Sequence, residues 1–331
     1  MASLLALGGT CTWFRDRVSD ALTKERNAIL RHYWVYTQDL LDYLKWTQAV
    51  ISGEAALAFI ARNRGLLTDA LEICVKNSCS EDLLSWFDQH KAVSRAISYE
   101  EWPPLDDRRP TVYVFNSPTG RTIRVICSHT LSPLTPITTY PTTALFNYFD
   151  AYSFGSAYRD LTMNRRAVVP DLPYLNDEDA ERVARITELG GFEQSQWPAV
   201  VAFPPVPFVL HDALGGWGLP DHEQLMNTTC LRARHQCPGQ TRFFGDAGSM
   251  VEFFAPDMID HGVMAHLGFT PYGTTAVWRM PSGECDLNCA GGDYVLRESA
   301  SETSVLLQPL SYGPFTTAIK GRIVVGESEH Q

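Results

Sequence analysis

Apolar residues recur every three or four positions near the start of the chain, and this spacing predicts a helical segment from Asp16 to about Gln48. The short apolar run at 49–52 then predicts a buried strand, and the stretch after Gly53 returns to a helical pattern. Residues 70–75 form a second apolar run of strand length. The next segment, SEDLLSWFDQH, predicts a helix with its first serine as the N-cap.

A β-hairpin is predicted at residues 111–128, where two alternating β-branched runs flank the turn sequence NSPTG. Residues 176–191 predict a helix, because they begin with acidic residues and end with glycine. Prolines at positions 133, 136 and 141 predict loop or edge strand there, and four prolines disfavour a regular central strand at 197–210.

The last hundred residues predict short strands, such as TTAVWRM and TSVLLQPL, separated by glycine-rich loops. The expected fold class is therefore α/β (α+β), with a mixed sheet flanked by helices and a strand- and loop-rich C-terminal half. We expect a boundary near residue 170, which divides the chain into a core at 1–170 and a C-terminal region at 171–331.

The net charge restricts the class of ligand. The chain has 27 basic and 38 acidic residues, for a net charge of −11. An acidic surface repels a phosphate backbone, so broad nucleic-acid binding is not expected, although a local basic site could bind one nucleotide. No apolar run reaches the roughly 20 residues of a membrane span, and no basic residue precedes the apolar patch at the N-terminus. We therefore expect a cytoplasmic or nuclear protein with reduced cysteines.

One constellation has the pattern of a phosphate site. The order is strand, Gly53, helix, loop and a strand with acidic residues, namely Asp69 at its start and Glu72 within it. A glycine between a strand and a helix lets a phosphate approach the amides of the helix N-terminus. Carboxylates that share one face of the next strand could hold Mg²⁺ there. The alternative is a tight turn beside a strand that tolerates one charge.

Three blocks carry a resemblance to a known family: ISGEAALAFIARNRGLLTDALEICV, VYVFNSPTGRTIRVI and ALFNYFDAYSFGSAYRDLTMNRRAV. They resemble consecutive blocks of the nucleotidyltransferase-like proteins of mushroom-forming fungi, and the later RFFGDAGSMVEFF is similar to another segment of that family. The resemblance extends over roughly residues 45–255. It implies a nucleotidyltransferase-like sheet in which Ser52 and Gly53 bind the triphosphate, and in which Asp69 and Glu72 are catalytic and hold Mg²⁺.

The chain departs from the family pattern at the residues that matter most for catalysis. Glu54 stands where the family has serine, and Ala70 stands at the first carboxylate position, with Asp69 displaced from it by one residue. A shift of one residue in a strand turns a side chain to the opposite face. Arg124 stands where the resemblance implies a third carboxylate. We therefore expect an eroded metal site, with Arg121 and Arg124 as a basic wall for a phosphate or as solvated side chains.

These departures favour a non-catalytic protein, or one that has been repurposed to bind a nucleotide or another ligand. One alternative is an active Mg²⁺-dependent nucleotidyltransferase that moves a nucleoside monophosphate to an unknown acceptor. Another is a protein-interaction module with a vestigial site. The partner is accordingly a small-molecule nucleotide or a protein.

A separate metal hypothesis concerns Cys230, Cys237, Cys285 and Cys289, which form a C-x6-C and a C-x3-C pair. Four thiolates could hold a structural Zn²⁺ in the loop-rich C-terminal half. Buried reduced thiols are the favoured interpretation, because the spacing is looser than in zinc knuckles and free cysteine is among the most buried residue types.

Overall fold

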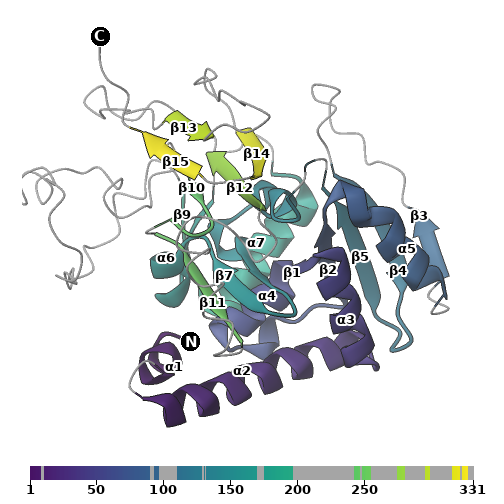
Figure 1. Cartoon of the computed structure of the whole chain (residues 1–331), viewed down its shortest axis with the longest axis horizontal. Coiled ribbons are helices and arrows are strands. Elements are labelled where there is room, and N and C mark those ends of the chain that lie inside the picture. Colours follow the sequence, from purple (N-terminus) through teal and green to yellow (C-terminus); the bar gives the residue numbers. More distant parts are fainter. Residues whose placement is uncertain are drawn as a thin grey trace, which may run out of the picture.

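A computed structural model of the chain was analysed (Figure 1). It describes residues 1–8, 11–89, 93–96, 110–128, 130, 132–169, 175–196, 242–246, 248–254, 274–279, 295–298, 315–320 and 323–326.

The helices and strands of these residues have the following bounds. The helices are α1 (Ala2–Gly8), α2 (Thr12–Tyr33), α3 (Thr37–Thr47), α4 (Gly53–Ala61), α5 (Ser80–Gln89), α6 (Arg159–Met163) and α7 (Asp177–Gly190), with the short 3₁₀ helices η1 (Arg64–Leu66), η2 (Asn77–Cys79), η3 (Thr135–Thr139) and η4 (Thr143–Leu145). The strands are β1 (Val50–Ser52), β2 (Ala70–Val75), β3 (Val93–Ala96), β4 (Thr111–Asn116), β5 (Thr122–Cys127), β6 (Asn147–Phe149), β7 (Ser153–Ser156), β8 (Arg166–Val169), β9 (Glu193–Gln196), β10 (Arg242–Phe243), β11 (Met250–Phe253), β12 (Thr274–Arg279), β13 (Val295–Glu298), β14 (Phe315–Lys320) and β15 (Ile323–Gly326).

The main sheet has eight strands in the order β11-β7-β6-β1-β2-β5-β4-β3. Strands β2 and β5 pair in parallel, whereas the other neighbouring strands of this sheet are antiparallel. In Figure 1, α2 runs along the bottom of the molecule and α5 lies beside the β4 and β3 edge. The fold is thus a mixed sheet flanked by helices, which confirms the coarse prediction of an α+β protein.

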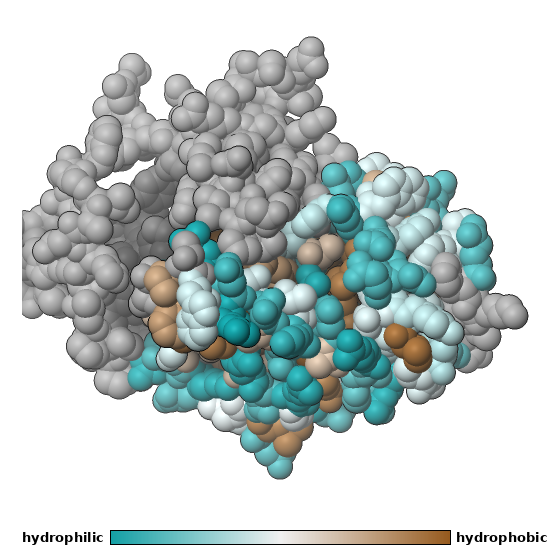
Figure 2. Space-filling model, turned by 60° about the horizontal axis from the view of Figure 1, so that its bottom comes forward, coloured by the Kyte–Doolittle hydropathy of each residue, from teal (hydrophilic) through white to brown (hydrophobic). Residues whose placement is uncertain are grey.

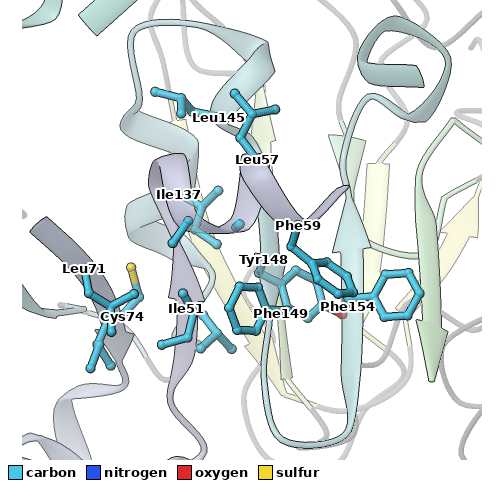
Figure 3. Close-up of a cluster of buried hydrophobic side chains, with 14 of the residues drawn as sticks. Ile51, Leu57, Phe59, Leu71, Cys74, Ile137, Leu145, Tyr148, Phe149 and Phe154 are labelled. Carbon is cyan, nitrogen blue, oxygen red and sulfur yellow. The ribbon is translucent and has the colours of Figure 1, made fainter. Parts of the chain in front are cut away.

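The core is built around α4, which is apolar on almost every side and is buried from Gly53 to Ile60. A helix of this composition is typical of a protein interior. Helix α4 packs against β1, β2 and β6, and Figure 3 shows part of this contact, with Phe59 near the aromatic rings of the β6–β7 hairpin. The residues labelled there, all fully buried, are Ile51, Leu57, Phe59, Leu71, Cys74, Ile137, Leu145, Tyr148, Phe149 and Phe154.

The segment from Asp16 to about Gln48 is helical as predicted, but it consists of two helices, α2 and α3. The chain leaves the helical conformation at Trp34, whose backbone is extended with φ −142° and ψ 122°. The ring of Trp34 is fully buried and contacts Trp86 and Phe87 of α5. Burial of this ring against a distant helix therefore accompanies a break that the local spacing does not reveal.

The prediction of Ser80 as an N-cap is also wrong. Helix η2 continues directly into α5, and the Ser80 backbone is already helical at φ −65° and ψ −45°. Its hydroxyl donates a hydrogen bond to the Asn77 carbonyl at 2.8 Å instead of accepting one from the helix N-terminus. A preceding turn thus takes the place of a side-chain cap.

The predicted hairpin is confirmed as the antiparallel pair β4 and β5. The predicted helix at 176–191 is α7, with Asn176 as its side-chain N-cap and Gly191 in the left-handed conformation at its end. The prolines near position 136 lie in turns and in η3, and TTAVWRM contributes β12. The segments at 197–210 and TSVLLQPL lie outside the described residues. Strand β11 pairs with β7, so the main sheet extends past the predicted boundary at 170.

One face of the described part of the molecule is mainly polar. Figure 2 shows a face on which hydrophilic residues predominate and hydrophobic residues form separate spots. Among the described helices, none combines the length and apolar character that a bilayer crossing requires.

Candidate functional site

The candidate site lies where β1 turns into α4 beside β2. Ser52 and Glu72 are directly opposite each other in the antiparallel β1–β2 pair, so their side chains share one face of the sheet. Gly53 follows with φ +66°, and a Cβ atom on it would lie 2.2 Å from Glu72 Oε2. The predicted approach of Glu72 to the Gly53 turn is therefore present, and only glycine fits this position.

Asp69 does not join Glu72, so the predicted pair of metal-binding carboxylates is not assembled. Strand β2 begins one residue after Asp69, whose side chain is 85% exposed and forms an ion pair with Arg121. Positions 69 and 72 are an odd number of residues apart and do not share a face of an extended strand. Asp69 and Arg121 are thus a surface ion pair beside the site.

Arg124 lies beside Glu72 because the parallel β2–β5 register pairs these two residues. Its Nη1 atom is 3.9 Å from Glu72 Oε1 and 3.1 Å from Glu178 Oε1 of α7. The side chain is one-third exposed. Arg124 therefore lies at the rim of the site, where it contacts two carboxylates of the chain itself.

The centre of the site is occupied by Arg182 of α7. Its Nε and Nη2 atoms donate to the two carboxylate oxygens of Glu54 at 2.8 and 2.6 Å, and Nη2 also donates to Glu72 Oε2 at 2.8 Å. The guanidinium lies over the Tyr140 ring, 4.7 Å from its centroid. Arg185 adds a hydrogen bond of 2.7 Å to Glu54 Oε1. Two carboxylates and two guanidinium groups therefore balance one another.

A chain of hydrogen bonds also reaches Glu72 Oε2, the oxygen that Arg182 contacts. Tyr140 donates its hydroxyl proton to Glu72 Oε2 at 2.7 Å. The Ser52 hydroxyl lies 2.6 Å from the Tyr140 oxygen and must donate to it, because the tyrosine proton is already used. By the same reasoning the Cys74 thiol, 3.2 Å from Ser52 Oγ, donates to the serine. Ser52 is thus held inside the protein rather than presented to a phosphate.

The electrostatics of the site favour the ionised network. Burial raises the pKa of Glu54, but the Arg182 charge and the hydrogen bonds from Arg182 and Arg185 outweigh it and lower the pKa. Burial lowers the pKa of Arg182, yet the charges of Glu72 and Glu54 raise it well above its usual range. Burial and the Glu72 charge raise the pKa of Tyr140, so the phenol remains a hydrogen-bond donor. Burial raises the pKa of Cys74 to about 12, so its thiol stays protonated.

The donor set does not fit Mg²⁺. A magnesium ion prefers near-octahedral oxygen ligands at about 2.0–2.1 Å, whereas both carboxylates here contact the same guanidinium nitrogen. Among the described residues, no group of three or more histidine, cysteine, aspartate or glutamate side chains is placed to hold a metal ion. The candidate zinc ligands Cys230, Cys237, Cys285 and Cys289 lie outside the described residues.

Sequence reasoning missed Tyr140, Arg182 and Arg185, and it noted Glu54 only as a departure from the family pattern. The available signal was the spacing of Arg182 and Arg185, which are three residues apart and therefore share a face of a helix. Nothing in that spacing identifies the carboxylates that they meet more than a hundred residues earlier.

The site as built can hold a guanidinium group between two carboxylates and an aromatic ring. It presents neither a carboxylate pair free for a metal ion nor a serine hydroxyl free for a phosphate. A comparison with models of known protein families finds no match to the chain, and a search of curated proteins finds none either.

Proposed function

We propose that the chain is a non-catalytic protein with a nucleotidyltransferase-like fold, in which the metal and nucleotide site is replaced by an internal ion-pair network. The observation that carries the proposal is the position of Arg182. Its guanidinium contacts Glu54 at 2.6 Å and Glu72 at 2.8 Å, where catalysis would require a metal ion. In phosphoryl and nucleotidyl transfer, positioning and charge neutralisation by the metal ion provide most of the rate enhancement.

The burial of the network supports the same proposal. The side chains of Glu54, Glu72 and Arg182 are only 6%, 7% and 12% exposed. Removing one partner of a buried ion pair costs about 3–5 kcal/mol. A magnesium–nucleotide complex that displaced Arg182 would have to offset this loss before it could bind.

An active enzyme is the second candidate, and one observation favours it: Glu72 faces the Gly53 turn. An active enzyme would further require that Asp69 rotate into the site and that Arg182 leave it. Asp69 is instead paired with Arg121 at the surface.

Isothermal titration calorimetry with ATP, GTP, CTP and UTP, each with and without Mg²⁺, tests the proposal. We expect no binding that Mg²⁺ enhances, and no transfer of labelled nucleotide to the protein or to small acceptors. Binding that Mg²⁺ enhances and Glu72→Gln abolishes would establish the active enzyme instead. Asp160→Asn is the matched control, because it removes an exposed carboxylate of α6 that pairs with Arg159 outside the site.

A further inference from the structure

Helix α7 buries few apolar side chains. Of its fourteen residues, only Ile186 and Gly190 are buried, and Leu189 is 50% exposed. The side chain of Asn63 donates a hydrogen bond to the Leu189 carbonyl at 3.0 Å near the C-terminal end of α7. Ion pairs join the rest of the helix to the core: Glu178 pairs with Arg124, and Arg182 and Arg185 pair with the carboxylates of the site. An element with few buried apolar residues is one that opens locally at low free energy.

The groups that surround the Arg182 guanidinium have the geometry of an arginine-recognition site. Glu54 receives the guanidinium edge through two parallel hydrogen bonds, from Nε and Nη2. Glu72 receives a further bond from Nη2, and the Tyr140 ring lies against the face of the same group. A planar cation with a rigid fork of donors matches this arrangement, whereas an ammonium group or a metal ion does not reproduce it.

The site is also organised independently of Arg182. The Tyr140 hydroxyl holds Glu72, and Ser52 and Cys74 in turn fix the orientation of that hydroxyl. Glu54 lies in the first turn of α4, a helix buried along nearly all of its length. The groups that recognise the guanidinium are therefore carried by the rigid core, while the guanidinium is carried by the weakly packed helix.

We propose that Glu54, Glu72 and Tyr140 form a guanidinium-binding site, that Arg182 is its intramolecular ligand, and that α7 is a latch which an arginine side chain of another molecule can displace. This goes beyond the nucleotide question, since it assigns a ligand class to the site whether or not the chain binds nucleotides.

Chemical rescue of Arg182→Ala tests the binding site. The alanine variant lacks the atoms of an ethylguanidinium ion, and we expect its melting temperature to fall by about 5–15 °C. Ethylguanidinium chloride at millimolar concentration should restore most of the loss, whereas ethylammonium, sodium and magnesium chlorides should not. Arg185→Ala is the control, because Arg185 is one-third exposed and makes a single bond to Glu54, so no selective rescue is expected. Equal rescue by ethylammonium or Mg²⁺ would overturn the assignment of a guanidinium site.

Hydrogen exchange of the intact wild-type chain tests the latch and does not depend on the variant being folded. N-acetyl-arginine methylamide should accelerate exchange of the α7 amides several-fold and leave the α4 amides unchanged, and the lysine analogue should do neither. If the α7 amides exchange only together with those of α4, or if the arginine and lysine analogues act alike, α7 is not a displaceable latch.

Discussion

Substitution of Gly53 by alanine tests the geometry at the centre of the site. The added Cβ would lie 2.2 Å from Glu72 Oε2 and 2.9 Å from Arg182 Nη2, so both groups must move. Neither is a freely swinging surface side chain, since Glu72 also accepts a hydrogen bond from Tyr140 and Arg182 is held by Glu54. Making room for the added Cβ atom therefore separates the Glu72–Arg182 ion pair.

The expected magnitude has two parts. Gly53 has φ +66°, a left-handed conformation that costs about 1–2 kcal/mol for a residue with a Cβ atom. Separation of the buried Glu72–Arg182 pair adds about 3–5 kcal/mol. We expect Gly53→Ala to lower the free energy of unfolding by about 4–7 kcal/mol, obtained by adding these two ranges.

A matched control separates the cost of breaking the ion pair from the cost of the backbone conformation. Gly120 has φ +76°, but a Cβ atom on it would meet nothing within 4 Å. Gly120→Ala should therefore lower the free energy of unfolding only by the cost of the left-handed backbone conformation, about 1–2 kcal/mol. Urea unfolding of both variants, followed by far-UV circular dichroism, gives the two losses under the same conditions. If Gly53→Ala is no less stable than Gly120→Ala, the Glu72 carboxylate is not held against the glycine, and the site proposed for Arg182 is incorrect.

Three further results are expected. Asp69→Asn should change the free energy of unfolding by less than about 1 kcal/mol, as expected for an exposed ion pair, whereas Glu72→Gln should lower it by about 3 kcal/mol or more in the same urea assay. Burial raises the pKa of Glu54, but the guanidinium groups around it outweigh burial and lower the pKa below its ordinary 4.5. Ionised Glu54 therefore stabilises the folded protein fully above that pH, and this stabilisation is lost as the pH falls through the folded-state pKa. The difference in urea midpoint between wild type and Glu54→Gln should accordingly narrow below about pH 4.5. Mass-spectrometric mapping after thiol labelling at pH 8 should find Cys11 modified in the native protein and Cys74 modified only after unfolding, because Cys74 is buried and has its pKa raised to about 12.

The parts of the fold that the sequence predicts well are those specified by neighbours along the chain. The β4–β5 hairpin follows from alternating residues around a turn that contains Gly120, and β1, α4 and β2 follow from apolar runs interrupted at Gly53. The end of α7 follows from Gly191, which takes the left-handed conformation there. Each of these features depends on a spacing of a few residues.

The features that sequence reasoning misses depend on contacts between distant segments. The break after Tyr33 accompanies burial of Trp34 against Trp86, and the helical spacing continues across it undisturbed. Arg182 meets Glu54 and Glu72 across 128 and 110 residues. Sequence reasoning places Glu72 correctly at the Gly53 turn, yet from one sequence it cannot identify which cation will balance that charge.

Glu54 and Arg182 are best understood as a pair that depends on each other. Two nearly buried carboxylates beside Gly53 require a cation, because an unpaired charge in such a position is strongly unfavourable. Under the proposed nucleotidyltransferase-like fold, a serine would stand at the position of Glu54 and a metal ion would supply the positive charge. A glutamate there adds a second negative charge in the space that a phosphate would need, and Arg182 supplies the positive charge from within the chain. With Glu54 alone, the carboxylates would repel each other; with Arg182 alone, the guanidinium would lose its two-bond partner. The same pair of residues fills the place that our proposal assigns to a lost metal ion and joins α7 to the core, so any change that releases the helix must also leave two buried carboxylates in need of another cation.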